Sequence, residues 1–79
     1  MAKKTSRILP VAPFERVAKR AGAERTSGDG LKALRDAAED YAEGLAREAI
    51  AFAKHAGRKT VKAEDVRLAA KRSGNPPEQ

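Results

Sequence analysis

The chain has 79 residues, no cysteine and one histidine, and a formal net charge of +6 from 17 lysines and arginines against 11 acids. The lack of cysteine excludes disulfides and thiolate metal sites, and one histidine is too few for a structural zinc, so we expect no metal and no cofactor. The excess of basic over acidic residues favours a polyanionic partner such as nucleic acid. With two phenylalanines, one tyrosine and no tryptophan, the chain lacks the stacking platforms that bind single strands.

The two ends of the chain differ from its middle. Residues 1–7, MAKKTSR, are basic without an apolar pattern and are predicted to form a disordered arm. Residues 74–79, GNPPEQ, are predicted to form a disordered tail, which leaves 8–73 for the fold. No apolar run is long enough to span a bilayer, and the start lacks the apolar core of a secretory signal, so we expect a cytoplasmic protein without a membrane partner.

The first predicted helix covers about 10–21, with two prolines in or near its first turn and a glycine stop at Gly22. Its apolar residues recur at helical spacing, which leaves Arg16 and Lys19 facing outward. The third predicted helix covers about 63–72 and has Asp65 in its first turn. Strand signals are almost absent, so the predicted fold class is all-α.

The second predicted helix begins at the N-cap Ser27 and ends before Gly57. At about 29 residues it would be roughly 43 Å long, whereas a compact globule of this chain length has a radius of gyration of only about 12 Å. Two short helices cannot cover its apolar stripe, so we expect a dimer, formed with a second copy or with a paralogous chain. The residues expected in the dimer core are Leu34, Ala38, Tyr41, Leu45 and Ala49.

The turn after the second helix gathers cations and then acids, HAGRKTVKAED at 55–65. A catalytic dyad of His55 and Asp65 would need a nucleophile in a cleft. The serines lie in the arm, at a helix cap and near the tail, and so small a chain has no room for a pocket. We therefore expect no catalytic residues, no small-molecule substrate and no enzyme. An edge that binds a strongly anionic partner is the favoured alternative.

Several motifs resemble those of archaeal histones, over about 8–72. They are LPVAP at 9–13, AGAER at 21–25, Ser27, and above all HAGRKTVKAEDV at 55–66. The resemblance implies the histone fold, in which short, long and short helices form a head-to-tail intertwined dimer. It also implies binding and wrapping of double-stranded DNA, with dimers joining into nucleosome-like assemblies.

The resemblance also assigns residues to roles. Phosphate and groove contacts to DNA are expected at Arg16, Lys19, Arg25, Thr26, Ser27, Arg58, Lys59, Thr60 and Lys62. Arg58 and Asp65 are expected to pair and to tie the turn to the third helix. A contact between dimers is expected from Phe52, His55 and Asp65, and Gly22 is a candidate for close approach between superhelical layers.

The predicted function is therefore that of a non-enzymatic chromatin protein, associated with the nucleoid, which compacts duplex DNA with little sequence specificity. The alternative is a histone-fold interaction subunit of a transcription complex that hardly binds DNA itself. A membrane-surface helix is disfavoured, because the apolar stripe is rich in alanine and lacks the bulky side chains of such helices.

Overall fold

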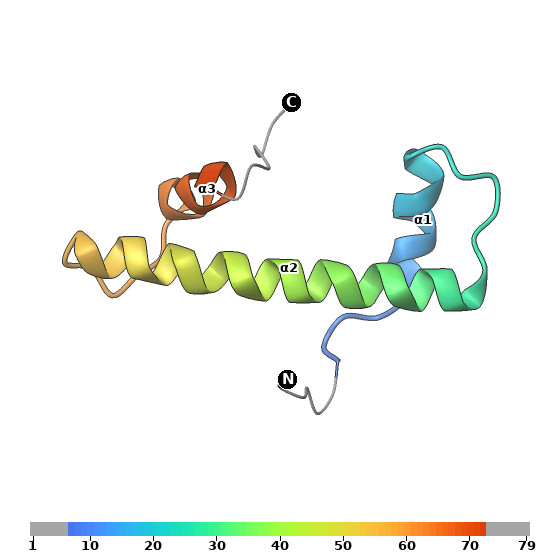
Figure 1. Ribbon diagram of the computed structural model, residues 1–79, viewed down its shortest axis with the longest axis horizontal. Helices are drawn as coiled ribbons and strands as arrows, with labels where there is room; N and C mark the ends of the chain where they lie inside the picture. The colour runs from blue at the N-terminus through green and yellow to red at the C-terminus, as the bar shows by residue number, and fades with distance from the viewer. Residues whose placement is uncertain (1–6, 73–79) are drawn as a thin grey trace. The chain divides into compact units, whose positions relative to one another are not determined.

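The computed structural model describes residues 7–72, which form three α-helices and no strand (Figure 1). Helix α1 spans Ala12–Arg20, α2 spans Gly28–His55 and α3 spans Ala63–Arg72. With 28 residues in α2 against 9 in α1 and 10 in α3, the predicted all-α, short–long–short order is confirmed. Within this described range no helix is both long and apolar enough to cross a bilayer. The predicted tail at 74–79 and residues 1–6 of the predicted arm lie outside it.

Glycines end the first two helices, as predicted. Gly22 has φ 111° and Gly57 has φ 76°, values that residues with a Cβ adopt only with strain. After α1 the N–H of Ala23 donates to the carbonyl of Ala18 at 3.0 Å, and equivalent hydrogen bonds surround Gly57. These are Schellman motifs, which satisfy the last carbonyls of a helix and turn the chain sharply. Both turns that contain the candidate binding residues are therefore set by local backbone chemistry.

Helix α2 runs through two compact units, Met1–Asp40 and Tyr41–Gln79. The first unit contains α1 and the start of α2, and the second contains the rest of α2 and α3. At 28 residues α2 is about 42 Å long, more than a compact globule of this size spans. Each short helix therefore belongs to a unit with its own part of α2.

The apolar side chains buried in the described chain all belong to alanine, namely Ala18, Ala49, Ala53, Ala69 and Ala70. Seven larger apolar side chains are 37 to 48% exposed, namely Val17, Leu34, Tyr41, Ile50, Val61, Val66 and Leu68. Burying one such side chain fully contributes about 1.5–3 kcal/mol, so a single chain leaves most of its apolar stabilisation unused. The fold is suited to association with another chain.

The residues expected in a dimer core divide into two groups. Leu34 and Tyr41 stay 37% and 42% exposed, and Ala38 and Leu45 are half-buried. Ala49 differs, because it is already fully buried within the second unit, where α3 also contributes buried alanines. Alanine at this position therefore allows α2 and α3 of one chain to pack closely.

Gly44 lies in the middle of α2, and replacing it tests how much a glycine there lowers the stability of the helix. A Cβ added to Gly44 would meet nothing within 4 Å, and the residue has an ordinary negative φ. Glycine costs a helix interior about 0.5–1 kcal/mol relative to alanine. We expect Gly44→Ala to raise the free energy of unfolding by that amount, measured by thermal denaturation at fixed protein concentration. A destabilised variant would mean that another chain packs directly against Gly44.

Candidate nucleic-acid interface

The turn between α2 and α3 is organised by Arg58. Its Nη1 donates to Asp65 Oδ2 at 2.9 Å and its Nη2 to Asp65 Oδ1 at 3.1 Å, which is a two-point guanidinium–carboxylate pair. Nη1 also donates to the carbonyl of Thr60 at 3.0 Å, and Nη2 lies 3.4 Å from Glu64. The structure thus brings together the two residues expected to pair. Arg58 directs its charge into its own chain, which leaves the neighbouring side chains to face a partner.

Asp65 also caps α3. Its Oδ2 accepts a hydrogen bond from the backbone N–H of Lys62 at 2.8 Å, the arrangement by which an acid in the first turn satisfies the residue before a helix. Asp65 is 2% exposed. The hydrogen bonds from Arg58 and then from Lys62 hold the pKa of the Asp65 carboxyl below its ordinary value of 3.8. The charged form of Asp65 therefore stabilises the turn.

The lowered pKa of Asp65 gives a pH dependence of known sign. Its stabilising contribution is complete above the ordinary pKa of 3.8 and is lost as the pH falls through the lower folded-state pKa. We expect Asp65→Asn to lower the melting temperature by several degrees at pH 7, with the difference from the parent shrinking as the pH falls from 3.8 through the lower folded-state pKa. Circular dichroism melts across this range measure it. Glu64→Gln is the matched control, because its carboxylate is 68% exposed and should contribute little.

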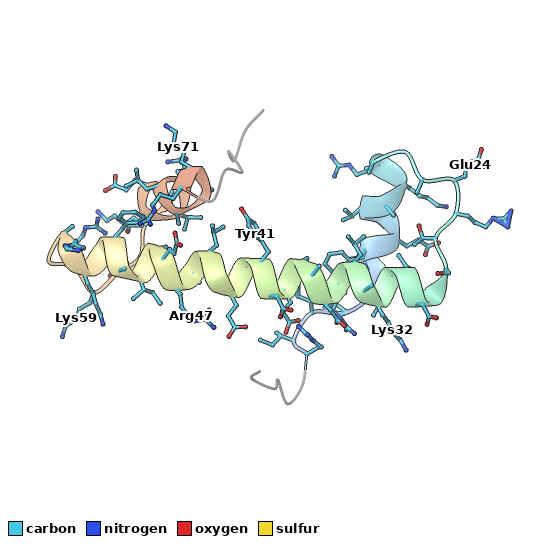
Figure 2. All side chains as sticks on the ribbon, viewed as in Figure 1. Glu24, Lys32, Tyr41, Arg47, Lys59 and Lys71 are labelled. Atoms are coloured by element: carbon cyan, nitrogen blue, oxygen red, sulfur yellow. The ribbon has the colours of Figure 1, made fainter. Side chains whose placement is uncertain are left out.

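Beyond Arg58, the same turn presents side chains to solvent. Lys59, Thr60 and Lys62 are all exposed, and no hydrogen bond from their side chains occurs among the described residues. Figure 2 shows Lys59 extending away from the ribbon. Two cations and a hydroxyl on a short, fixed turn suit phosphate oxygens, which accept hydrogen bonds from such groups without reading the sequence of bases.

The turn between α1 and α2 is held by a side-chain cap. Ser27 Oγ accepts a hydrogen bond from the N–H of Gly30 at 3.0 Å, which confirms the predicted N-cap. A Cβ at Gly30 would lie 3.0 Å from Thr26 Cγ2 and 3.2 Å from Ser27 Oγ, so glycine lets the turn approach the helix closely. Arg25 is exposed and Thr26 half-buried. This places an arginine beside the positive N-terminal end of α2.

Helix α1 contributes an exposed polar face. Its buried residue is Ala18, while Arg16 and Lys19 on either side of it are exposed. Within the first unit, α1 and the turn that carries Arg25 are consecutive in the chain. The cations expected on this unit are therefore available to an anion.

The three residues expected to join dimers differ in their exposure to solvent. Phe52 is half-buried and His55, at the end of α2, is exposed. Asp65 is 2% exposed, and both of its carboxylate oxygens accept hydrogen bonds from Arg58. No group of three or more metal-binding side chains occurs in residues 7–72.

A contact that the sequence did not reveal ties the start of the described chain to α2. Glu39 Oε1 accepts hydrogen bonds from the backbone N–H groups of Ile8 at 3.0 Å and of Leu9 at 2.9 Å. Arg35 Nη1 donates to the carbonyl of Leu9 at 2.9 Å. These bonds attach the segment before α1 to α2, and α1 begins at Ala12, two residues after the expected residue 10.

Arg7 extends the same contact. Its Nη1 donates to Asp40 Oδ1 at 2.9 Å and its Nε lies 3.3 Å from Asp36 Oδ1. The hydrogen bond to Asp40 raises the pKa of Arg7, and the backbone hydrogen bonds from Leu9 and Ile8 lower the pKa of Glu39. Arg7 was expected in a disordered arm that ends at residue 7. In the structure its guanidinium group contacts Asp36 and Asp40 on α2.

Comparison with known proteins identifies this arrangement of helices. The model of a family described as histone-like transcription factors (CBF/NF-Y) and archaeal histones matches residues 7–70. The chain belongs to this histone family. Its three helices are therefore the short, long and short helices of a histone fold.

Two archaeal relatives show how near the similarity is. An archaeal histone of Thermococcus zilligii, one of the subunits of HAN1, is 59% identical over 63 residues, which cover 80% of this chain and 94% of the relative. Probable archaeal histone 3 of Methanocaldococcus jannaschii is 51% identical over 61 residues, covering 77% and 91%. As a member of this histone family, the chain is a DNA-binding chromatin protein and not an enzyme.

Proposed function

We propose that this histone forms a head-to-tail dimer and that the dimer wraps and compacts double-stranded DNA with little sequence specificity. Support for association comes from α2, on which Leu34 and Tyr41 remain more than a third exposed. A 28-residue helix with such a stripe has more apolar surface than one chain covers. The partner is a second copy or a paralogous histone with a matching stripe.

Support for duplex binding comes chiefly from the turn after α2. The pair between Arg58 and Asp65 fixes the backbone, while Lys59 and Thr60 stay exposed. In a head-to-tail dimer this turn lies beside the turn of the other chain that carries Arg25 and Ser27. We call each such pair of turns a paired edge. It offers cations, hydroxyls and the N-terminus of α2 to phosphates. Arg16 and Lys19 on the two α1 helices supply contacts between the edges.

Wrapping follows from having several contact points on one face. A straight duplex cannot reach both paired edges and the α1 helices together, whereas a bent one can. Bending a site of this size costs on the order of several kcal/mol, which added phosphate contacts offset. The protein would accordingly be chromosome-associated.

Joining of dimers into longer assemblies is assigned to Phe52 and His55 at the end of α2. His55 is exposed and can meet a neighbouring chain. Asp65 enters this contact only through a lone pair that Arg58 and Lys62 leave open. Gly22 has open space where a Cβ would be, which suits close approach of another turn of the assembly.

Binding to a random-sequence duplex across a range of salt concentrations tests the proposal. We expect affinity to fall steeply with salt and to differ little between unrelated sequences, because phosphate contacts dominate. No binding at low salt would contradict it. That result would favour a histone-fold interaction subunit of a transcription complex.

A further inference from the structure

Glu39 on α2 holds the chain just before it enters α1. Its Oε1 accepts hydrogen bonds from the N–H groups of Ile8 at 3.0 Å and of Leu9 at 2.9 Å, and its side chain is 11% exposed. Arg35, one turn earlier on α2, donates to the carbonyl of Leu9 at 2.9 Å. The chain crosses α2 here and then continues into α1 (Figure 1). Because both main-chain groups of Leu9 are bonded to α2, the position and direction of the chain are fixed at this residue.

The link from Leu9 to α1 is short and stiff. Two residues separate Leu9 from Ala12, where α1 begins. Pro10 and Pro13 lock their own φ angles and restrict the residues before them. Val11, the residue before the helix, already has a helical φ of −82° and ψ of −36°. The orientation in which α1 starts therefore follows from the hydrogen bonds at Leu9.

Apolar packing within one chain holds α1 only weakly. Among the residues Ala12–Arg20, only Ala18 is buried, and an alanine has a single methyl group to contribute. Val17 beside it remains 48% exposed. The hydrogen bonds of Glu39 and Arg35 thus supply a directional attachment to α2 that the small apolar contact of α1 does not.

The position of α1 matters because of the cations that it carries. Arg16 and Lys19 are exposed on α1, and the proposed function assigns them contacts with the duplex between the paired edges. A helix that populates the binding position only part of the time binds with an affinity reduced by that fraction. Holding α1 in place before the duplex arrives removes this cost.

We propose that Glu39 is a positioning residue for duplex binding, which holds α1 through the main chain of Ile8 and Leu9 so that Arg16 and Lys19 meet phosphates. The inference rests on the proposed function and deepens it. Glu39 acts here as a hydrogen-bond acceptor and does not touch the duplex. An acid that acted through its charge alone would repel phosphates, and any neutral substitute would then raise the affinity.

Glu39→Gln and Glu39→Met form a matched pair of variants. Both substitutes are uncharged and similar in size and helix propensity, but only glutamine has an oxygen that can accept both N–H groups. We expect Glu39→Gln to bind a random-sequence duplex at least as tightly as the parent. We expect Glu39→Met to bind about tenfold more weakly near 0.1 M salt, with a slope of log affinity against log salt that is shallower by about 1 to 2.

Fluorescence anisotropy with a labelled duplex measures these affinities. Circular dichroism and sedimentation at the same protein concentration show whether the helices and the dimers are retained. Equal affinities of the two variants would overturn the proposal. So would a loss in Glu39→Met that is explained entirely by missing helices or missing dimers, because Glu39 would then serve the fold alone.

A second readout requires substitutions at exposed residues only. Coupling between two sites is reciprocal, so duplex binding should in turn stabilise the hydrogen bonds to Glu39. We expect the amide hydrogens of Ile8 and Leu9 to exchange at least about threefold more slowly in the duplex complex than in the free protein. A variant with Arg16→Gln and Lys19→Gln, compared at saturating duplex, should lose this extra protection.

Extra protection that persists in the doubly substituted variant would overturn the proposal, and so would exchange that the duplex leaves unchanged in the parent. Failure of the proposed function looks different. The parent chain would then not bind a duplex at low salt, although slow exchange at Ile8 and Leu9 would still report their hydrogen bonds to Glu39.

Discussion

Replacing Arg25 and Lys59 together with alanine is expected to lower duplex affinity at least about a hundredfold near 0.1 M salt and to flatten its salt dependence. Both side chains are exposed on turns whose backbones are fixed by Ser27 and by the pair between Arg58 and Asp65. A dimer carries each residue twice, so the double substitution removes about four cations from the phosphates. The slope of log affinity against log salt should become shallower by about 3 to 4.

The matched control removes the same charge from elsewhere. Lys32 and Arg47 are exposed on α2 and belong to neither of the two turns that carry Arg25 and Lys59. Replacing both with alanine should change affinity only a few-fold, through the general field of the protein. Fluorescence anisotropy with a labelled duplex at several salt concentrations measures both variants. Equal losses in the two would show that net charge, and not the turns, carries the binding.

Placing a charge on the apolar stripe of α2 is expected to abolish dimerisation and much of the helical structure. Tyr41 is 42% exposed in one chain and lies in the predicted dimer core. Tyr41→Asp would bury an unpaired carboxylate in each copy, at a cost on the order of 3 kcal/mol per copy. We expect self-association to weaken at least about a hundredfold, which corresponds to about 2.7 kcal/mol.

Ala51→Asp is the control for that experiment. Ala51 is exposed on α2, about 80° from Tyr41 around the helix and farther from most of the stripe, so the same charge there stays in water. Analytical ultracentrifugation gives the oligomeric state, and circular dichroism at micromolar concentration gives the helicity. A Tyr41→Asp protein that remained a fully helical dimer would mean that chains associate through another surface.

Local chemistry explains why much of the fold was predictable. Gly22 and Gly57 end helices because they tolerate positive φ, and Ser27 caps α2 because its hydroxyl accepts a backbone hydrogen bond. Apolar residues at three- and four-residue steps predicted the length of α2. Each signal lies within a few residues of the feature that it predicts.

The contact between residues 7–9 and α2 was not predictable, because its partners lie far apart in the sequence. Glu39 and Leu9 are 30 residues apart, and Glu39 fits the pattern of an ordinary solvated acid on a polar helix face. Arg7 follows two lysines, so it resembles part of a basic arm. Ala49 illustrates a further difficulty, because helical periodicity places it on the stripe without showing that it is buried within its own unit. Such contacts depend on which segments meet in three dimensions.

Nuclease digestion of a long random-sequence duplex coated with the purified protein tests the central claim most directly. If dimers wrap DNA and join side by side, the protected fragments should form a ladder that rises in regular steps. Protection of a single short length would show isolated dimers and would remove the contact assigned to Phe52 and His55. A duplex that is digested as fast as bare DNA at low salt would contradict DNA packaging by this protein.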